Sequence, residues 1–193
     1  MDKPVDPNVR ILTLNCWGLK FVSSKRSARI EAIAKRLHES ADKYDVIALQ
    51  EVWVEEDYNI LRDSVKHYLR FAKRWYSGII TGPGLVVFSR WPIESTWIYR
   101  FPLNGRPSAF WRGDWYVGKA AGSCVIKHPS GRKLEIINAH LHAPYAPSGD
   151  ANYACHRASQ AWDMTGIVWR AILSGHVVFV TGDLNARPQS VSL

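Results

Sequence analysis

Two short polar side chains, Asp183 and Asn185, follow an apolar stretch near the end of the chain, Val177–Val180. The mostly β-branched residues of this stretch predict a strand, and we expect it to be buried on both faces. If the backbone stays extended past the strand, both polar side chains point to the same side of the sheet end. A carboxylate and a carboxamide there suit a metal ion, water or phosphate, whereas a simple Asp-Asn turn is the structural alternative.

Three other predicted strands also end in polar residues of compatible type. These residues are Asn15 after Val9–Leu14, Glu51 after Asp45–Leu49 and His140 after Lys133–Ala139. A helical pattern between the first two strands predicts a right-handed crossover, which brings their ends to one edge of a sheet. Taken alone, Glu51 is explained as a solvated acid and His140 as a hydrogen-bonded structural histidine. Four strand ends with matching polar groups together predict one site.

This set of side chains favours a hard divalent cation. A glutamate with an asparagine amide suits Mg²⁺, which takes few protein ligands and keeps several waters. The cysteines, Cys16, Cys124 and Cys155, are odd in number and lack the spacing of a zinc site, so we expect free thiols in a reducing compartment.

The rest of the chain supplies the elements that hold these strand ends. Ala151–Leu173 predicts a long helix with Trp162 on its apolar side, and Pro129–Gly131 predicts the turn of a hairpin. Mixed strands with helices between and outside them predict an α/β fold with two packed sheets. We expect residues 1–8 to be an N-terminal extension and residues 9–193 to be part of a single domain.

Composition narrows the function classes. The net charge of +8 favours anionic partners, which are nucleic acid, an acidic membrane surface or a phosphorylated substrate. No apolar run reaches the roughly 18 residues that span a bilayer, and the first ten residues lack the apolar centre of a signal peptide. We therefore expect an intracellular protein.

Four sequence blocks carry a family resemblance. LTLNCWG, ALQEVW, NAHLHA and TGDLN, in this order, resemble the signature blocks of the DNase I-like endonuclease/exonuclease/phosphatase superfamily. Within it the chain is similar to neutral sphingomyelinases, and APYAPSGDANYACHRASQAWD resembles the fungal inositol phosphosphingolipid phospholipases C. The resemblance implies a four-layer α/β/β/α sandwich of two mixed sheets, the second incomplete in this chain.

The resemblance also implies an activity. It is that of a Mg²⁺-dependent phosphodiesterase of the phospholipase C type, which converts inositol phosphosphingolipids or sphingomyelin to ceramide and a phosphorylated head group. By motif, Glu51 matches the metal ligand, with Asn15 beside it. His140, Asp183 and Asn185 match the groups that hold the phosphate and position the attacking water. The family further implies membrane association.

The segment around Asp114 and Lys119 has several interpretations. Its Gly118-Lys119-Ala120 is superficially like a phosphate-binding P-loop, but alanine stands where that motif needs Ser or Thr, so nucleotide binding is rejected. It resembles the Asp-Lys switch of neutral sphingomyelinases, which implies rearrangement on an anionic phospholipid surface. A surface loop with an incidental ion pair is the alternative. Nearby aromatic residues suit a lipid interface and equally suit stacking on bases.

One family block is missing. The general-base histidine of the family lies in a block that follows GDLN, and this chain stops at Leu193. We therefore expect a C-terminally truncated protein, with hydrolysis impaired by about 10²–10⁴-fold. A DNA nuclease of the same superfamily and a non-catalytic protein that binds metal or acidic lipid are the alternatives, and nucleic acid is the less favoured partner.

Overall fold

The structure is a computed structural model that describes residues 8–19, 23–76, 82–103, 119–143 and 151–186. The elements in chain order are β1 (Ile11–Asn15), α1 (Arg26–Ser40), the 3₁₀ turn η1 (Ala41–Lys43), β2 (Val46–Gln50), α2 (Glu55–Val65), β3 (Phe71–Trp75), β4 (Leu85–Ser89), β5 (Ile93–Arg100), β6 (Ala120–Lys127), β7 (Lys133–His140), α3 (Ala151–Leu173) and β8 (Val177–Asp183).

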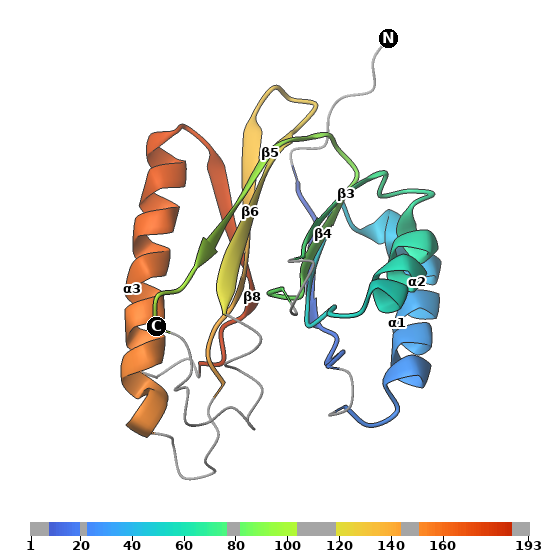
Figure 1. Ribbon diagram of the computed structural model, residues 1–193. Coiled ribbons are helices and arrows are strands. Elements are labelled where there is room, and N and C mark those ends of the chain that lie inside the picture. Colours follow the sequence, from blue (N-terminus) through green and yellow to red (C-terminus); the bar gives the residue numbers. More distant parts are fainter. Residues whose placement is uncertain (1–7, 20–22, 77–81, 104–118, 144–150, 187–193) are drawn as a thin grey trace.

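The strands form two four-stranded sheets packed face to face. Their orders are β1-β2-β4-β3 and β5-β6-β7-β8. Figure 1 shows α1 and α2 outside the first sheet and α3 outside the second. The α/β fold with two packed mixed sheets predicted from the sequence is therefore confirmed.

Alternation along β2 explains the layers. Ile47 and Leu49 face α1 and α2, where they pack with side chains such as Ile30 and Leu61. Val46 and Ala48, on the other face of the strand, pack against the second sheet. Successive residues of a strand point to opposite faces, so a strand covered on both sides must be apolar throughout.

Two expectations about burial are wrong. β8 pairs only with β7 in the described residues, and Val177 and Val180 are 39% and 45% exposed. The helix α3 has the predicted bounds, but Trp162 is 79% exposed and the buried face carries Met164 and Ile167 instead. Apolar composition identified these elements without specifying which side chains a neighbour covers.

The two sheets place four strand ends together. β1 and β2 are parallel, with Asn15 opposite Gln50, and β7 and β8 are parallel, with His140 opposite Asp183. All four strands end at the lower edge in Figure 1. The parallel pair predicted from the strand-helix-strand pattern is confirmed. No helix of the described residues is long and apolar enough to cross a membrane.

Candidate active site

Asn15 links the two sheets at the centre of the site. Its side-chain Nδ2 donates to Glu51 Oε1 and to Asp183 Oδ2, each over 2.9 Å. Its Oδ1 accepts from the backbone N–H of Trp17 over 2.9 Å, and this contact fixes the orientation of the amide. The structure therefore brings two carboxylates onto one neutral amide, as the predicted meeting of strand ends requires.

Asn15 itself acts here as a donor. The atom that could coordinate a metal, Oδ1, is engaged by the Trp17 N–H, while the NH₂ group faces both carboxylates. Direct ligation by Asn15 stays a prediction. The geometry adds a bridging role that holds Glu51 and Asp183 near each other.

The backbone at the site is strained. Four non-glycine residues in the described part of the chain have a left-handed backbone, and three of them, Trp17, Glu51 and Asn185, lie next to these strand ends. Such conformations are disfavoured for residues with a Cβ and are concentrated at functional sites. The neighbouring Gly18 packs so tightly that an added Cβ would lie 2.3 Å from the carbonyl oxygen of Glu51.

Asn185 does not continue the strand as expected. β8 ends at Asp183, and the left-handed backbone at Asn185 lets its N–H donate to Asp183 Oδ1 over 3.0 Å. Its side-chain Nδ2 donates to the carbonyl of Leu141 over 2.9 Å. The prediction of two side chains on one face of an extended chain is therefore wrong, and the Asp-Asn turn is what forms.

His140 is buried and neutral. Burial, the positive charge of Lys119 and the nearby His142 hold the pKa of His140 well below its usual 6.5. Lys119 Nζ lies 3.1 Å from His140 Nε2, and because an ammonium group only donates, Nε2 accepts. The 3.8 Å separation between Nε2 and Glu51 Oε1 is therefore no salt bridge.

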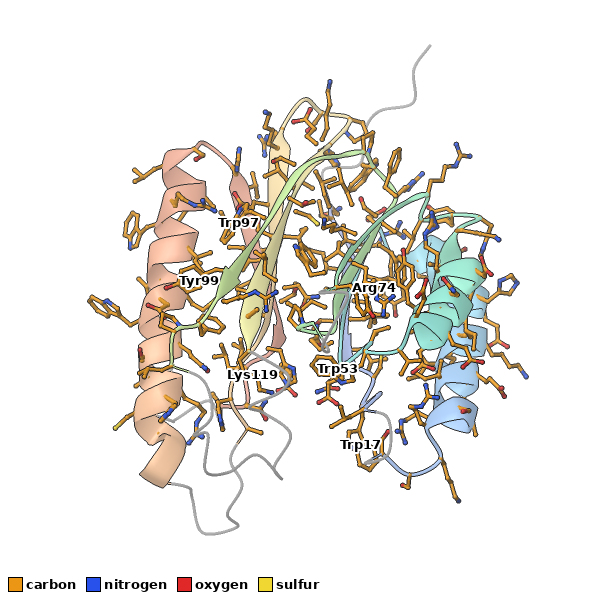
Figure 2. The ribbon with its side chains drawn as sticks, in the orientation of Figure 1. Trp17, Trp53, Arg74, Trp97, Tyr99 and Lys119 are labelled. Carbon is orange, nitrogen blue, oxygen red and sulfur yellow. The ribbon has the colours of Figure 1, made fainter. Side chains whose placement is uncertain are left out.

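Lys119 is itself buried, and Figure 2 shows it at the strand-end side of the molecule. It thus contributes positive charge to the site. Its predicted switch partner, Asp114, lies outside the described residues, so the switch stays a prediction.

A buried amide network that sequence reasoning missed lies directly beneath the site. Asn138 Nδ2 donates to the carbonyls of Leu49 and Val86, each over 3.0 Å, and so ties the second sheet to the first. Gln50 Nε2 donates to Asn138 Oδ1 over 2.7 Å and to Thr13 Oγ1 over 3.1 Å. The available signal was a polar residue inside each apolar run, one residue before Glu51 and two before His140.

The glycine in TGDLN has a packing reason. Gly182 has φ +130°, and a Cβ there would lie 1.9 Å from the carbonyl oxygen of Ala139. Only glycine lets β8 approach β7 this closely, which sets Asp183 beside His140.

No thiolate competes for a cation at this site. All three cysteines are free, as predicted. Burial, and to a smaller extent the negative charges of Glu51 and Asp57, raise the pKa of the nearby Cys16 to about 12.

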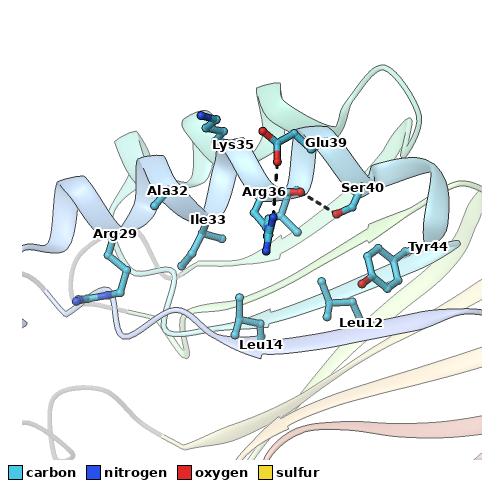
Figure 3. A pocket seen from close by; sticks show the side chains of 11 residues that line it. Leu12, Leu14, Arg29, Ala32, Ile33, Lys35, Arg36, Glu39, Ser40 and Tyr44 are labelled. Atoms are coloured by element: carbon cyan, nitrogen blue, oxygen red, sulfur yellow. Dashed lines mark hydrogen bonds and ion pairs between the residues drawn. The ribbon is translucent and has the colours of Figure 1, made fainter.

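A groove of about 710 Å³ between β1 and α1 is lined by Leu14 and Ile33, with Arg29 at one end (Figure 3). Neither Glu51 nor Asp183 lines this groove, so it is separate from the site.

Residues 12–193 match the family model described as Endonuclease/Exonuclease/phosphatase family. The chain is 45% identical to an inositol phosphosphingolipids phospholipase C of Saccharomyces cerevisiae over 95% of its own length and 42% of that protein. It is 37% identical to sphingomyelin phosphodiesterase 2 of Homo sapiens, again over 95% of this chain and 42% of the relative. The chain thus spans less than half the length of these relatives.

A crystal structure of a beta toxin variant from Staphylococcus aureus with bound magnesium ions has a similar fold. The TM-score is 0.73 at 18% identity, over 95% of this chain and 67% of the toxin. The chain belongs to the endonuclease/exonuclease/phosphatase family.

Proposed function

We propose that this site belongs to a Mg²⁺-dependent phosphodiesterase of the phospholipase C type that acts on inositol phosphosphingolipids or sphingomyelin. The products are ceramide and a phosphorylated head group. The observation that carries the proposal is the amide of Asn15, which holds Glu51 and Asp183 together across the two sheets. The substrate class is that named for the yeast and human relatives.

The donor set fits magnesium. Two carboxylate oxygens accept hydrogen bonds from one amide, and oxygen ligands suit this hard cation. Glu51 and Asp183 are the residues that would hold the ion, because Asn15 brings their carboxylates together. No third His, Cys, Asp or Glu side chain completes a metal-binding group with them in the described ranges, and water would fill the remaining positions around Mg²⁺. Bound there, it would offset negative charge on the phosphate and acidify a water. The magnesium ions in the toxin structure agree with this choice.

The other residues divide the remaining work. Asp183 also orients the attacking water through the oxygen that does not hold the ion, and His140 and Asn185 contact phosphoryl oxygens. Lys119, buried beside His140, supplies fixed positive charge where an anionic phosphodiester binds. An anionic phospholipid surface is the proposed activator; the net charge of +8 is compatible with it, although the same charge favours anionic partners in general.

The test is the release of head group from mixed micelles of inositol phosphoceramide or sphingomyelin, with and without Mg²⁺ and anionic phospholipid. We expect Mg²⁺-dependent release that Asp183→Asn lowers by about 10²–10³-fold. Glu135→Gln is the matched control, because it removes a buried carboxylate at the other end of the strands. Head-group release that does not depend on Mg²⁺ and is unchanged by Asp183→Asn would contradict the proposal. Nicking of plasmid DNA without cleavage of lipid would also contradict it.

A further inference from the structure

A large aromatic side chain stands in solvent at the rim of the site. Trp17 lies two residues beyond Asn15 and is 48% exposed. Its backbone N–H donates to Asn15 Oδ1, the amide that bridges the two carboxylates. Figure 2 shows Trp17 at the same end of the sandwich as Lys119. The backbone of Trp17 thus contacts the amide that bridges the two carboxylates of the proposed reaction centre.

Hydrogen bonds hold the backbone of residues 16–18 in place. Trp17 has a left-handed backbone with φ +48°, and the next residue, Gly18, donates its N–H to the Glu51 carbonyl over 3.0 Å. The Arg29 guanidinium donates to the carbonyls of Trp17 over 2.8 Å, Ser24 over 2.9 Å and Cys16 over 3.3 Å. Its central carbon lies 4.5 Å from the centre of the Trp17 ring.

The strained backbone and exposed ring of Trp17 are the features expected of a residue that contacts a ligand. The strained backbone of Trp17 costs folding free energy, and its exposed indole recovers none of that cost by burial in the free protein. An aromatic surface that is already fixed loses little freedom when it binds a ligand. The guanidinium of Arg29 beside the ring adds positive charge. Together they suit a ligand that is anionic at one point and has carbon–hydrogen surface next to it, as a phosphorylated head group has.

We infer that Trp17 is a substrate-contact residue: the head group esterified to the phosphate packs on its indole ring, which Arg29 holds in place. The inference rests on the proposed function and adds the surface that receives the head group. It concerns direct contact with that group and not anchoring of the protein to a bilayer.

Calorimetric titration of inositol phosphate and of phosphocholine, in the presence of Mg²⁺, tests the contact without requiring turnover. We expect Trp17→Ala to weaken binding of at least one of the two about five- to tenfold, and Trp17→Phe to restore most of it. Trp169→Ala is the matched control, because Trp169 is an exposed tryptophan on α3. We expect it to bind as the wild type does. Thermal unfolding verifies that each variant is folded.

The outcomes separate the two proposals. Wild-type protein that binds neither head-group phosphate contradicts the proposed function. Wild-type binding that Trp17→Ala leaves unchanged overturns the role of Trp17 alone. Unchanged head-group binding with loss of binding to sphingolipid vesicles also overturns it, because Trp17 would then be a bilayer contact. Equal losses in Trp17→Ala and Trp169→Ala would overturn it as well.

Discussion

β2 and β7 each carry an acidic or imidazole group near both ends, and the two ends are built differently. At one end, Asp45 precedes β2 and Glu135 lies near the start of β7. At the other, Glu51 follows β2 and His140 ends β7. The first pair of carboxylates is saturated with partners, whereas the carboxylate of Glu51 is joined to that of Asp183 through a single neutral amide.

Glu135 shows what a structural carboxylate looks like. It accepts from Ser123 Oγ over 2.6 Å and Trp97 Nε1 over 3.2 Å, and pairs with His176 Nδ1 over 2.7 Å. Burial alone would raise the pKa of Glu135, but these hydrogen bonds outweigh it and lower the pKa. Asp45 is held in the same way by two arginines.

At the site end, the described residues place no Lys or Arg side chain in an ion pair with Glu51 or Asp183. Glu51 and Asp183 share the Asn15 amide, and the backbone of Glu51 is left-handed. Proximity of like charges and a strained backbone both oppose folding, and burial elsewhere in the two-sheet core offsets them. The comparison teaches that the carboxylates at the two ends differ in their partners: within the described residues, those of Asp45 and Glu135 pair with arginine or histidine, and those of Glu51 and Asp183 share a neutral amide.

The largest expected effect appears when the same substitution, glutamate to glutamine, is made at each of the two ends in separate variants. Glu51→Gln should lower Mg²⁺-dependent head-group release by about 10²–10³-fold, because the charge that would hold the ion is removed. It should leave the urea-unfolding free energy unchanged or slightly higher, since a repulsion is relieved. Glu135→Gln is the control. If both variants lost head-group release equally, the proposed difference between a ligand-binding end and a structural end of the strands would be contradicted.

The amide network beneath the site should matter for stability. Asn138→Leu leaves the carbonyls of Leu49 and Val86 without their partner, so we expect the free energy of unfolding to fall by about 3 kcal/mol. Urea titration measures it. A midpoint equal to that of the wild type would show that Asn138 does not join the sheets.

Glu135→Gln should lower the free energy of unfolding by a smaller amount, about 2 kcal/mol. The hydrogen bonds that His176, Ser123 and Trp97 make to Glu135 lose their charged acceptor in this variant. The loss should appear in the urea midpoint while Mg²⁺ binding is unchanged. A weaker affinity for Mg²⁺ in this variant would mean that the two ends of the strands are coupled.

The smallest expected effect is a pH dependence. The pKa of Glu135 is lower in the folded protein than its ordinary 4.5, so its charge stabilises the fold above that value, and this stabilisation is lost as the pH falls through the folded pKa. Glu135→Gln should therefore have a flatter stability profile below pH 4.5 than the wild type. Identical slopes in urea titrations across this range would contradict the assignment.

Much of the site could be predicted from the sequence, because its residues follow directly after apolar runs that are recognisable within short segments of the chain. Apolar runs identified the strands, and parallel pairing brought Asn15, Glu51, His140 and Asp183 to one edge. The turn at Asn185 was named only as the alternative to an extended chain, because its left-handed backbone depends on two hydrogen bonds, one of them to Leu141.

The remaining errors concern tertiary contacts. Exposure of Val180 and Trp162 depends on which element lies beside β8 and α3, and the composition of a segment does not contain that information. The link from Asn138 to the first sheet joins residues about 50 and 90 positions apart. Neither periodicity nor spacing within one element predicts such a contact.

Titration of Mg²⁺ into the protein, followed by calorimetry for the wild type and Asp183→Asn, tests the central claim most directly. We predict one saturable site in the wild type and its loss in the variant, because Glu51 and Asp183 would then hold one ion together. Saturable binding of equal affinity in both proteins, or none in the wild type, would contradict the assignment of these two carboxylates.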